Sequence, residues 1–290
     1  MISDLFKNTK PSRQVLTLLL ALVFFMLLSM LLTGALQVLG IDCLEVENQR
    51  NLQFVSQLMM FLCPALLCVL IFENDGISVL GLAVCKGRGW YFLIGILFFV
   101  LLFPLTDWLT LWNDSWHFGG SLKMVEESLR RAGEVSSETV KQFLMLPGEA
   151  NLVLNLLILA LTPAVCEEFF FRGSLQRLML RWLNRPWAAI IITAVIFSLA
   201  HGELFAFVPR FFLGAFLGAL YYYSGVIWVN VLVHFLNNSI VVVSYYLYQV
   251  GAISTEPEML LHFPVWVVAL TGLLSAILFF LLLRRKRKLS

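Results

Sequence analysis

The sequence has few charged residues for its length: Asp, Glu, Lys and Arg make up 13% of its 290 residues. Soluble domains carry about twice that fraction, whereas 60% of this chain is hydrophobic. The composition therefore excludes an ordinary soluble domain and predicts a polytopic helical membrane protein. The net charge is only +2, with no basic patch interleaved with aromatic residues, so we expect no nucleic-acid partner.

Cysteine is also scarce, and no two cysteines have the C-x-x-C spacing of a zinc knuckle. The five are scattered at Cys43, Cys63, Cys68, Cys85 and Cys166. We expect them to serve packing, because no disulfide framework is suggested. The first long apolar run lacks a small-residue cleavage site, so it is interpreted as a retained span.

Eight apolar runs have the length of roughly 17 to 25 residues that a membrane-spanning helix needs. They lie at residues 15–38, 52–72, 89–112, 151–172, 187–206, 208–224, 226–249 and 263–283. The sequence therefore predicts an all-α fold, a polytopic transmembrane bundle of about eight helices. We expect one membrane-embedded domain over residues 1–290, with the lipid bilayer as its surroundings.

Basic residues gather on one side of the predicted spans. Lys7, Lys10 and Arg13 precede span 1, and Lys86 and Arg88 lie between spans 2 and 3. Arg172, Arg177, Arg181 and Arg185 lie between spans 4 and 5, and Arg284, Arg285, Lys286, Arg287 and Lys288 follow span 8. The opposite loops carry acids, namely Asp42, Glu45, Glu47, Glu126, Glu127, Glu134, Glu138, Glu256 and Glu258. The positive-inside rule then places both termini in the cytoplasm, which requires an even number of spans. A bacterial plasma membrane is the expected location.

The one long loop, residues 113–150, contains a stretch with apolar residues at helical spacing and charges between them. The apolar positions are Leu122, Val125, Leu129 and Ala132. We expect an amphipathic helix on the extracytoplasmic surface. A lid over an active site is the alternative to a plain interfacial helix.

Two adjacent carboxylates, Glu167 and Glu168, lie in or beside span 4. An ionised side chain within a bilayer has a high free-energy cost, so its presence there indicates a function. On a helix, Glu168 and Arg172 share a face, whereas Glu167 points about 100° away. An ion pair between Glu168 and Arg172 would explain those two residues structurally. It leaves Glu167 without a partner, as a desolvated general base or acid would be.

Two histidines in the same half of the chain are candidates to meet Glu167. The midpoint between Glu167 and His201 falls in the turn signal of residues 183–186, so an antiparallel hairpin would bring them level. His234 has Asn230 four residues before it and Asn238 four after it, which makes a polar stripe on one helix face. Asparagines also link membrane helices structurally, and His201 alone could be a satisfied buried histidine.

Two chemistries of amide hydrolysis fit these residues. In the first, Glu167 and His201 activate a water while His234 and Asn238 stabilise the oxyanion. In the second, Glu167, His201 and His234 bind zinc, although the H-E-x-x-H pattern is absent. The metal-free version is favoured slightly. Ser198 precedes His201 by three residues, but a serine nucleophile would leave the carboxylate pair without a task.

Three motifs in order resemble the signature of the CPBP intramembrane proteases. They are Glu167-Glu168-x-x-x-Arg172, Phe197-x-x-x-His201 and His234-x-x-x-Asn238, within residues 150–245. This family, also called Abi, includes type II CAAX prenyl endopeptidases and bacteriocin-processing or immunity proteins. The resemblance implies that these helices form a catalytic core. It gives Glu167 and His201 the activation of water, His234 and Asn238 the oxyanion, and Glu168 and Arg172 supporting roles.

The resemblance implies an endopeptidase acting on membrane-associated or peptide substrates, such as CAAX-type tails or bacteriocin and pheromone leader peptides. A non-catalytic immunity or scaffold protein that binds through the same polar cavity is the alternative. A proton-coupled carrier is a third hypothesis, weakened by the lack of an inverted repeat.

Five other residues receive structural interpretations. Asp107 is expected at the outer interface, and Glu203 with Arg210 as an exposed ion pair beside the turn between spans 5 and 6. Gly214 and Gly218, four residues apart in span 6, permit close contact with a neighbouring helix.

Overall fold

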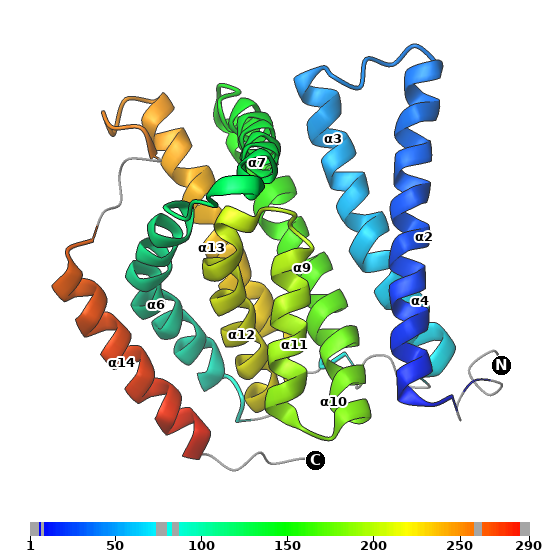
Figure 1. Cartoon of the computed structure of the whole chain (residues 1–290), viewed down its shortest axis with the longest axis vertical. Helices are drawn as coiled ribbons and strands as arrows, with labels where there is room; N and C mark the ends of the chain where they lie inside the picture. The colour runs from blue at the N-terminus through cyan, green and yellow to red at the C-terminus, as the bar shows by residue number, and fades with distance from the viewer. Residues whose placement is uncertain (1–5, 7–8, 74–79, 83–86, 258–262, 285–290) are drawn as a thin grey trace.

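The computed structural model describes residues 6, 9–73, 80–82, 87–257 and 263–284. Within these residues the regular structure is entirely helical, with no β-strand, which confirms the all-α prediction (Figure 1). The elements in order are α2 Pro11–Val38, α3 Val46–Gln57, η1 Leu58–Leu62, α4 Cys63–Phe72, α6 Trp90–Asp114, η2 Gly120–Leu122, α7 Lys123–Leu144, α8 Glu149–Asn155, η3 Leu156–Leu161, α9 Thr162–Glu168, η4 Phe169–Gln176, α10 Arg177–Leu183, α11 Pro186–Leu199, η5 Leu204–Ala206, α12 Phe207–Ser224, α13 Ile227–Gln249 and α14 Val265–Arg284.

Six helical segments among the described residues are long and apolar enough to cross a membrane. They are Pro11–Val38, Val46–Phe72, Trp90–Asp114, Glu149–Leu183, Leu204–Ser224 and Ile227–Gln249. Two shorter apolar helices, Pro186–Leu199 and Val265–Leu281, complete the eight expected runs. The predicted fifth span, residues 187–206, was too long: α11 ends at Leu199, and Gly202 follows at φ +71°, a backbone conformation that ends a helix.

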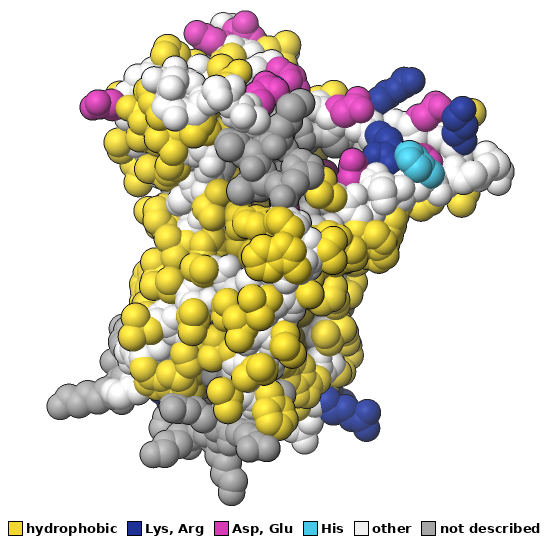
Figure 2. Space-filling view, turned by 90° about the vertical axis from the view of Figure 1, so that its left-hand side faces the viewer, with side chains coloured by type: hydrophobic (Ala, Val, Ile, Leu, Met, Phe, Trp, Pro, Cys, Tyr) yellow, Lys and Arg dark blue, Asp and Glu magenta, His cyan; other side chains and the backbone are white. Residues whose placement is uncertain are grey.

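The arrangement is that of an integral membrane protein. In Figure 1, α9–α13 form the centre, α2–α4 lie on one side, and α6 and α14 lie on the other. α2 begins and α14 ends at the same end of the bundle. A broad apolar belt separates the charged ends of the visible face (Figure 2), as burial in a bilayer requires.

The cytoplasmic placement of the termini stays a prediction. Some residues that entered the sequence argument, namely Lys7, Cys85, Lys86, Glu258 and those at 285–288, lie outside the described part of the chain.

The amphipathic helix expected in the long loop is α7. Its Glu126 accepts bonds from Arg130 and from the backbone N–H of Phe118, and contacts His117 Nδ1 at 2.9 Å. The guanidinium of Arg130 lies 3.8 Å from the ring centre of Phe205, which ties α7 to η5. Its extracytoplasmic position stays a prediction.

The segment Glu149–Leu183 is one continuous helix with two widened, π-helical stretches, η3 and η4. Such widened turns are often found at functional sites, because they re-aim side chains. The helix ends at Asn184, which has a left-handed φ of 51°, and α11 starts at Pro186. The structure therefore confirms the predicted hairpin, which required the fourth span to continue as a helix past residue 172 to about residue 181.

Gly214 and Gly218 bring α12 close to its neighbours, as predicted. A Cβ on Gly214 would lie 3.0 Å from Phe197 Cδ1, and one on Gly218 would lie 2.8 Å from Gln176 Oε1. Because glycine has no side chain, side chains of η4 can reach the carbonyl oxygens of Gly214 and Gly218. Arg172 Nη2 donates to Gly214 O at 3.0 Å, and Gln176 Nε2 donates to Gly218 O at 2.8 Å. Arg172 and Gln176, one helical turn apart, thus donate hydrogen bonds to two α12 carbonyl oxygens that are also one turn apart.

Candidate active site

Glu168 lies at the centre of a buried network. Its Oε1 accepts a hydrogen bond from Arg172 Nη1 at 2.8 Å and is 2.9 Å from His234 Nδ1. Its Oε2 accepts from Asn230 Nδ2 at 3.2 Å. The side chains of Glu168 and Arg172 have no exposed surface, and that of His234 is 4% exposed. The predicted pairing of Arg172 with Glu168 is present, and the carboxylate is also contacted by two side chains of α13, those of Asn230 and His234.

Glu167 receives no comparable hydrogen bonds from the residues that the structure describes. Its Oε2 is buried and has no hydrogen-bond partner among them. The same oxygen lies 3.9 Å from Nε2 of His201 and 3.9 Å from Nε2 of His234. α9, α13 and the turn after α11 therefore bring together the three residues that the sequence predicted to meet.

The hydrogen bonds of the two histidines orient their rings. His201 Nδ1 lies 2.8 Å from the carbonyl oxygen of Phe197, which can only accept, so Nδ1 carries the hydrogen. His234 Nδ1 is held in the same way by the carboxylate of Glu168. The ring of Phe197 packs edge-on against both imidazoles. Both Nε2 atoms are therefore left to face Glu167.

His201 lies outside α11, on the turn that follows it. Burial lowers the pKa of His201, against the opposing effect of the Glu167 carboxylate. A lowered pKa favours the neutral ring at neutral pH. In that form Nε2 has a free lone pair and can accept a proton.

The remaining predicted residues are placed differently. Asn238 accepts a bond from Asn237 Nδ2 at 3.3 Å, and among the described residues no hydrogen bond joins it to Glu167, His201 or His234. Ser198 is buried, and its hydroxyl donates to the backbone oxygen of Phe207, the first residue of α12, at 2.7 Å.

Two further predictions concern the region beyond this turn. Arg210 Nη2 and Glu203 Oε2 form an ion pair at 2.5 Å, but the two side chains are only 26% and 22% exposed. The prediction that this ion pair is exposed was therefore wrong, because Arg210 lines a cavity. Asp107, expected at the outer interface, lines the same cavity.

Asn230 belongs to the site, although no individual role was predicted for it. It is fully buried, and its amide nitrogen also donates to Leu217 O at 2.6 Å. Its position four residues before His234 was the available signal. Gln176 was missed, and its position one turn after Arg172 could have indicated the second bond to α12.

The zinc hypothesis can be compared with this geometry. Within the described part of the chain, no group of three or more His, Cys, Asp or Glu side chains is arranged to hold a metal ion. The donor chemistry of Glu167, His201 and His234 is nevertheless that of a zinc site. Zinc binding by these residues stays a prediction.

A comparison with known families matches residues 149–240 to the type II CAAX prenyl endopeptidase Rce1-like model. The match runs from α8 into α13 and includes all three motifs. It confirms the resemblance based on those motifs. Comparisons with curated proteins and with solved structures found no match.

Proposed function

Since residues 149–240 are of the type II CAAX prenyl endopeptidase Rce1-like family, we propose that this membrane protein is an endopeptidase in which Glu167 activates the attacking water. One observation carries the proposal: the buried, unpartnered Oε2 of Glu167 lies 3.9 Å from Nε2 of both histidines. A water between Glu167 Oε2 and the Nε2 atom of either histidine would be within hydrogen-bonding distance of both atoms. Its oxygen could then attack a carbonyl carbon.

The proposed reaction uses the two histidines differently. Glu167 takes one proton from water, and His201 Nε2 accepts a hydrogen bond from the other hydrogen. The water oxygen bonds to the carbonyl carbon, which gives a tetrahedral oxyanion. Glu167 then returns the proton to the amide nitrogen as the C–N bond breaks. Atoms and charge balance within this group.

His234 is the proposed donor to the oxyanion. When it is protonated, its Nδ1–H is bound by Glu168 and its Nε2–H is free to donate. Glu167, Glu168, Arg172 and protonated His234 together carry no net charge, which suits a buried site. Asn238, one turn after His234, is the proposed second donor. Its Nδ2 has no hydrogen-bond partner among the described residues.

The test compares cells that make equal amounts of wild type, Glu167→Gln and Ser198→Ala. Peptide termini of membrane and secreted fractions are measured by mass spectrometry. We expect new termini with wild type and Ser198→Ala, and a loss of at least about 100-fold with Glu167→Gln. Ser198→Ala is the matched control, because Ser198 is buried beside His201 but its hydroxyl bonds only backbone.

Equal termini with Glu167→Gln and wild type would reject the proposal. If no new termini appear but a phenotype such as bacteriocin resistance persists in both, the non-catalytic alternative replaces it. Treating purified wild type with a chelator tests the metal-free mechanism separately, which requires that activity survive.

A further inference from the structure

Two polar cavities adjoin beside the turn that carries His201. The first, here called the α13 cavity, has a volume of about 420 Å³ and lies between α6, α12 and α13. Its polar wall residues are Thr106, Asp107, Thr110, Arg210, Asn237 and Ser244. The second, here called the α7 cavity, has a volume of about 410 Å³ and lies between α6, α7 and η5. Thr110 and Ala206 line both cavities, so the two spaces meet at these residues.

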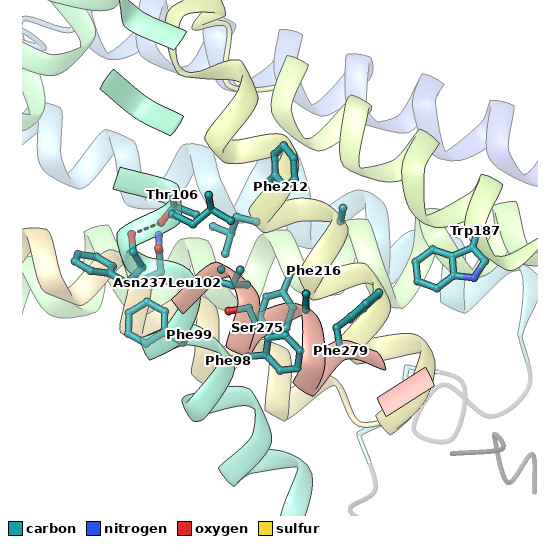
Figure 3. A pocket seen from close by; sticks show the side chains of 16 residues that line it. Phe98, Phe99, Leu102, Thr106, Trp187, Phe212, Phe216, Asn237, Ser275 and Phe279 are labelled. Carbon is teal, nitrogen blue, oxygen red and sulfur yellow. Dashed lines mark hydrogen bonds between the residues drawn. The ribbon is translucent and has the colours of Figure 1, made fainter. Parts of the chain in front are cut away.

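A third cavity, of about 290 Å³, adjoins the α13 cavity but is apolar. The two share Phe103, Thr106, Leu213 and Asn237. Figure 3 shows the phenylalanine rings of this apolar cavity between Asn237 at one end and Trp187 at the other. Ser275 in its wall already donates to Thr271 O at 2.8 Å. Cavities lined by apolar groups of this kind remain dry.

The α13 cavity, in contrast, contains groups that need water. Arg210 Nη2 is paired with Glu203 at 2.5 Å, whereas Nη1 is buried without a hydrogen-bond partner among the described residues. A buried donor without a partner is costly, and an internal water removes that cost. Asp107 adds a carboxylate to the same wall, and ionisable residues of membrane helices commonly face water-filled cavities. The cavity has room for on the order of ten water molecules.

Two wall residues connect the α13 cavity with the proposed reaction centre. Arg210 is paired with Glu203, which is two residues after His201 on the same turn. Asn237 Nδ2 donates to the Oδ1 atom of Asn238, the proposed second donor to the oxyanion. The side chain of His201 is itself 29% exposed. Water in this cavity is therefore adjacent to the residues that would use it.

The α7 cavity connects the same space with the surface. The side chain of Asp114 in its wall is 67% exposed, and Glu134 of α7 is exposed as well. Bulk water therefore reaches the α7 cavity. It can enter the α13 cavity where Thr110 and Ala206 line both spaces, and a bulky side chain in place of Ala206 would obstruct that junction.

Resting on the proposed function, we propose that the α7 and α13 cavities form one hydrated path that supplies the His201 turn with the water consumed in hydrolysis. Each hydrolysed peptide bond consumes a water molecule, but the bundle is surrounded by a broad apolar belt (Figure 2). A path lined by polar side chains brings water past that belt without exposing it to lipid. The apolar cavity is not part of this path.

The test is hydroxyl-radical footprinting, because radiolysis of a water molecule labels the side chains next to it. Full-length wild type in lipid nanodiscs receives X-ray pulses in isotopically labelled water, and oxidised side chains are quantified by mass spectrometry. Tyr245 lines the α13 cavity and Phe98 lines the apolar cavity, and both are buried, at 3% and 1% exposure. We expect Tyr245 to be labelled at least about tenfold faster than Phe98.

Two matched variants test the path itself. Ala206→Phe should slow the labelling of Tyr245 at least about fivefold, because it obstructs the junction. It should also reduce the new peptide termini in cells. Ala276→Phe makes the same change in the apolar cavity and should leave the labelling of Tyr245 unaltered.

Equal protection of Tyr245 and Phe98 in wild type overturns this inference, whether or not Ala206→Phe folds. Labelling of Tyr245 or production of termini that a folded Ala206→Phe protein leaves unchanged overturns it as well. Footprinting of wild type needs no substrate. Failure of the proposed protease therefore appears separately, as equal peptide termini with wild type and Glu167→Gln.

Discussion

Replacing Arg172 by methionine tests whether the Glu168 network is built from mutually dependent charges. Arg172 donates to Glu168 Oε1 and to Gly214 O, and its guanidinium carbon lies 4.7 Å from the ring centre of Phe197. Methionine keeps much of the volume but leaves a buried carboxylate without its cation. Removing one partner of a buried pair costs about 3 to 5 kcal/mol.

The measurement is thermal unfolding in detergent, followed with a thiol-reactive dye. Cys166 and Cys68 are free and nearly inaccessible, at 1% and 4% exposure, so they label only when the bundle opens. We expect Arg172→Met to lower Tm by about 10 °C. The control is Arg181→Met, which removes a 39% exposed arginine paired with Glu73 and should cost no more than about 1 kcal/mol.

The double variant Glu168→Gln/Arg172→Met removes both charges and should lose about 2 to 3 kcal/mol less than the two single changes added together. Additive losses, or an Arg172→Met protein as stable as Arg181→Met, would refute the argument. Activity is unsuited to this test, because Glu168 also orients His234.

Two further predictions concern packing and pH. Gly218→Ala should destabilise the protein by about 1 to 3 kcal/mol, because its Cβ would meet Gln176 Oε1 at 2.8 Å; Gly34→Ala, with nothing within 4 Å, should be neutral or stabilising in the same dye assay. The pKa of Glu126 is lowered from 4.5 to about 2, chiefly by its hydrogen bond with His117. The stability that Glu126 contributes should be complete above about pH 4.5 and lost as pH falls toward 2. The Tm difference between wild type and Glu126→Gln should therefore shrink over that range, and a constant difference would contradict the assignment.

The sequence predicted the parts of the site that follow from helix periodicity. Residues four apart share a face, which gave the pairing of Glu168 with Arg172 and the alignment of Asn230 with His234. The turn signal before Pro186 gave the hairpin that brings His201 level with Glu167. These inferences needed only local geometry and the length of the chain between two points.

The sequence could not predict contacts that depend on how helices pack against each other. Nothing in the spacing of Asn238 shows that its oxygen accepts a bond from Asn237. Likewise, Glu203 and Arg210 have the spacing of an ordinary ion pair beside a turn. Only the packing of α6 and α13 against α12 makes a cavity over Arg210 and leaves Nη1 without a partner.

The adjacent glutamates show how one dipeptide can supply both a structural and a chemical group. Successive helix residues differ by about 100° in direction, so Glu168 and Glu167 face different neighbours. Glu168 is surrounded by nitrogen groups of Arg172, Asn230 and His234, and its contact with Nδ1 gives the His234 ring a defined orientation. Among the described residues, Glu167 Oε2 faces the two Nε2 atoms of His201 and His234, each 3.9 Å away. If Glu168 were replaced by a residue that cannot bond to His234 Nδ1, the His234 ring would lose its orientation. Glu167 would then lose one of the two nitrogens it faces. The supporting glutamate is therefore required for the geometry from which the other could act.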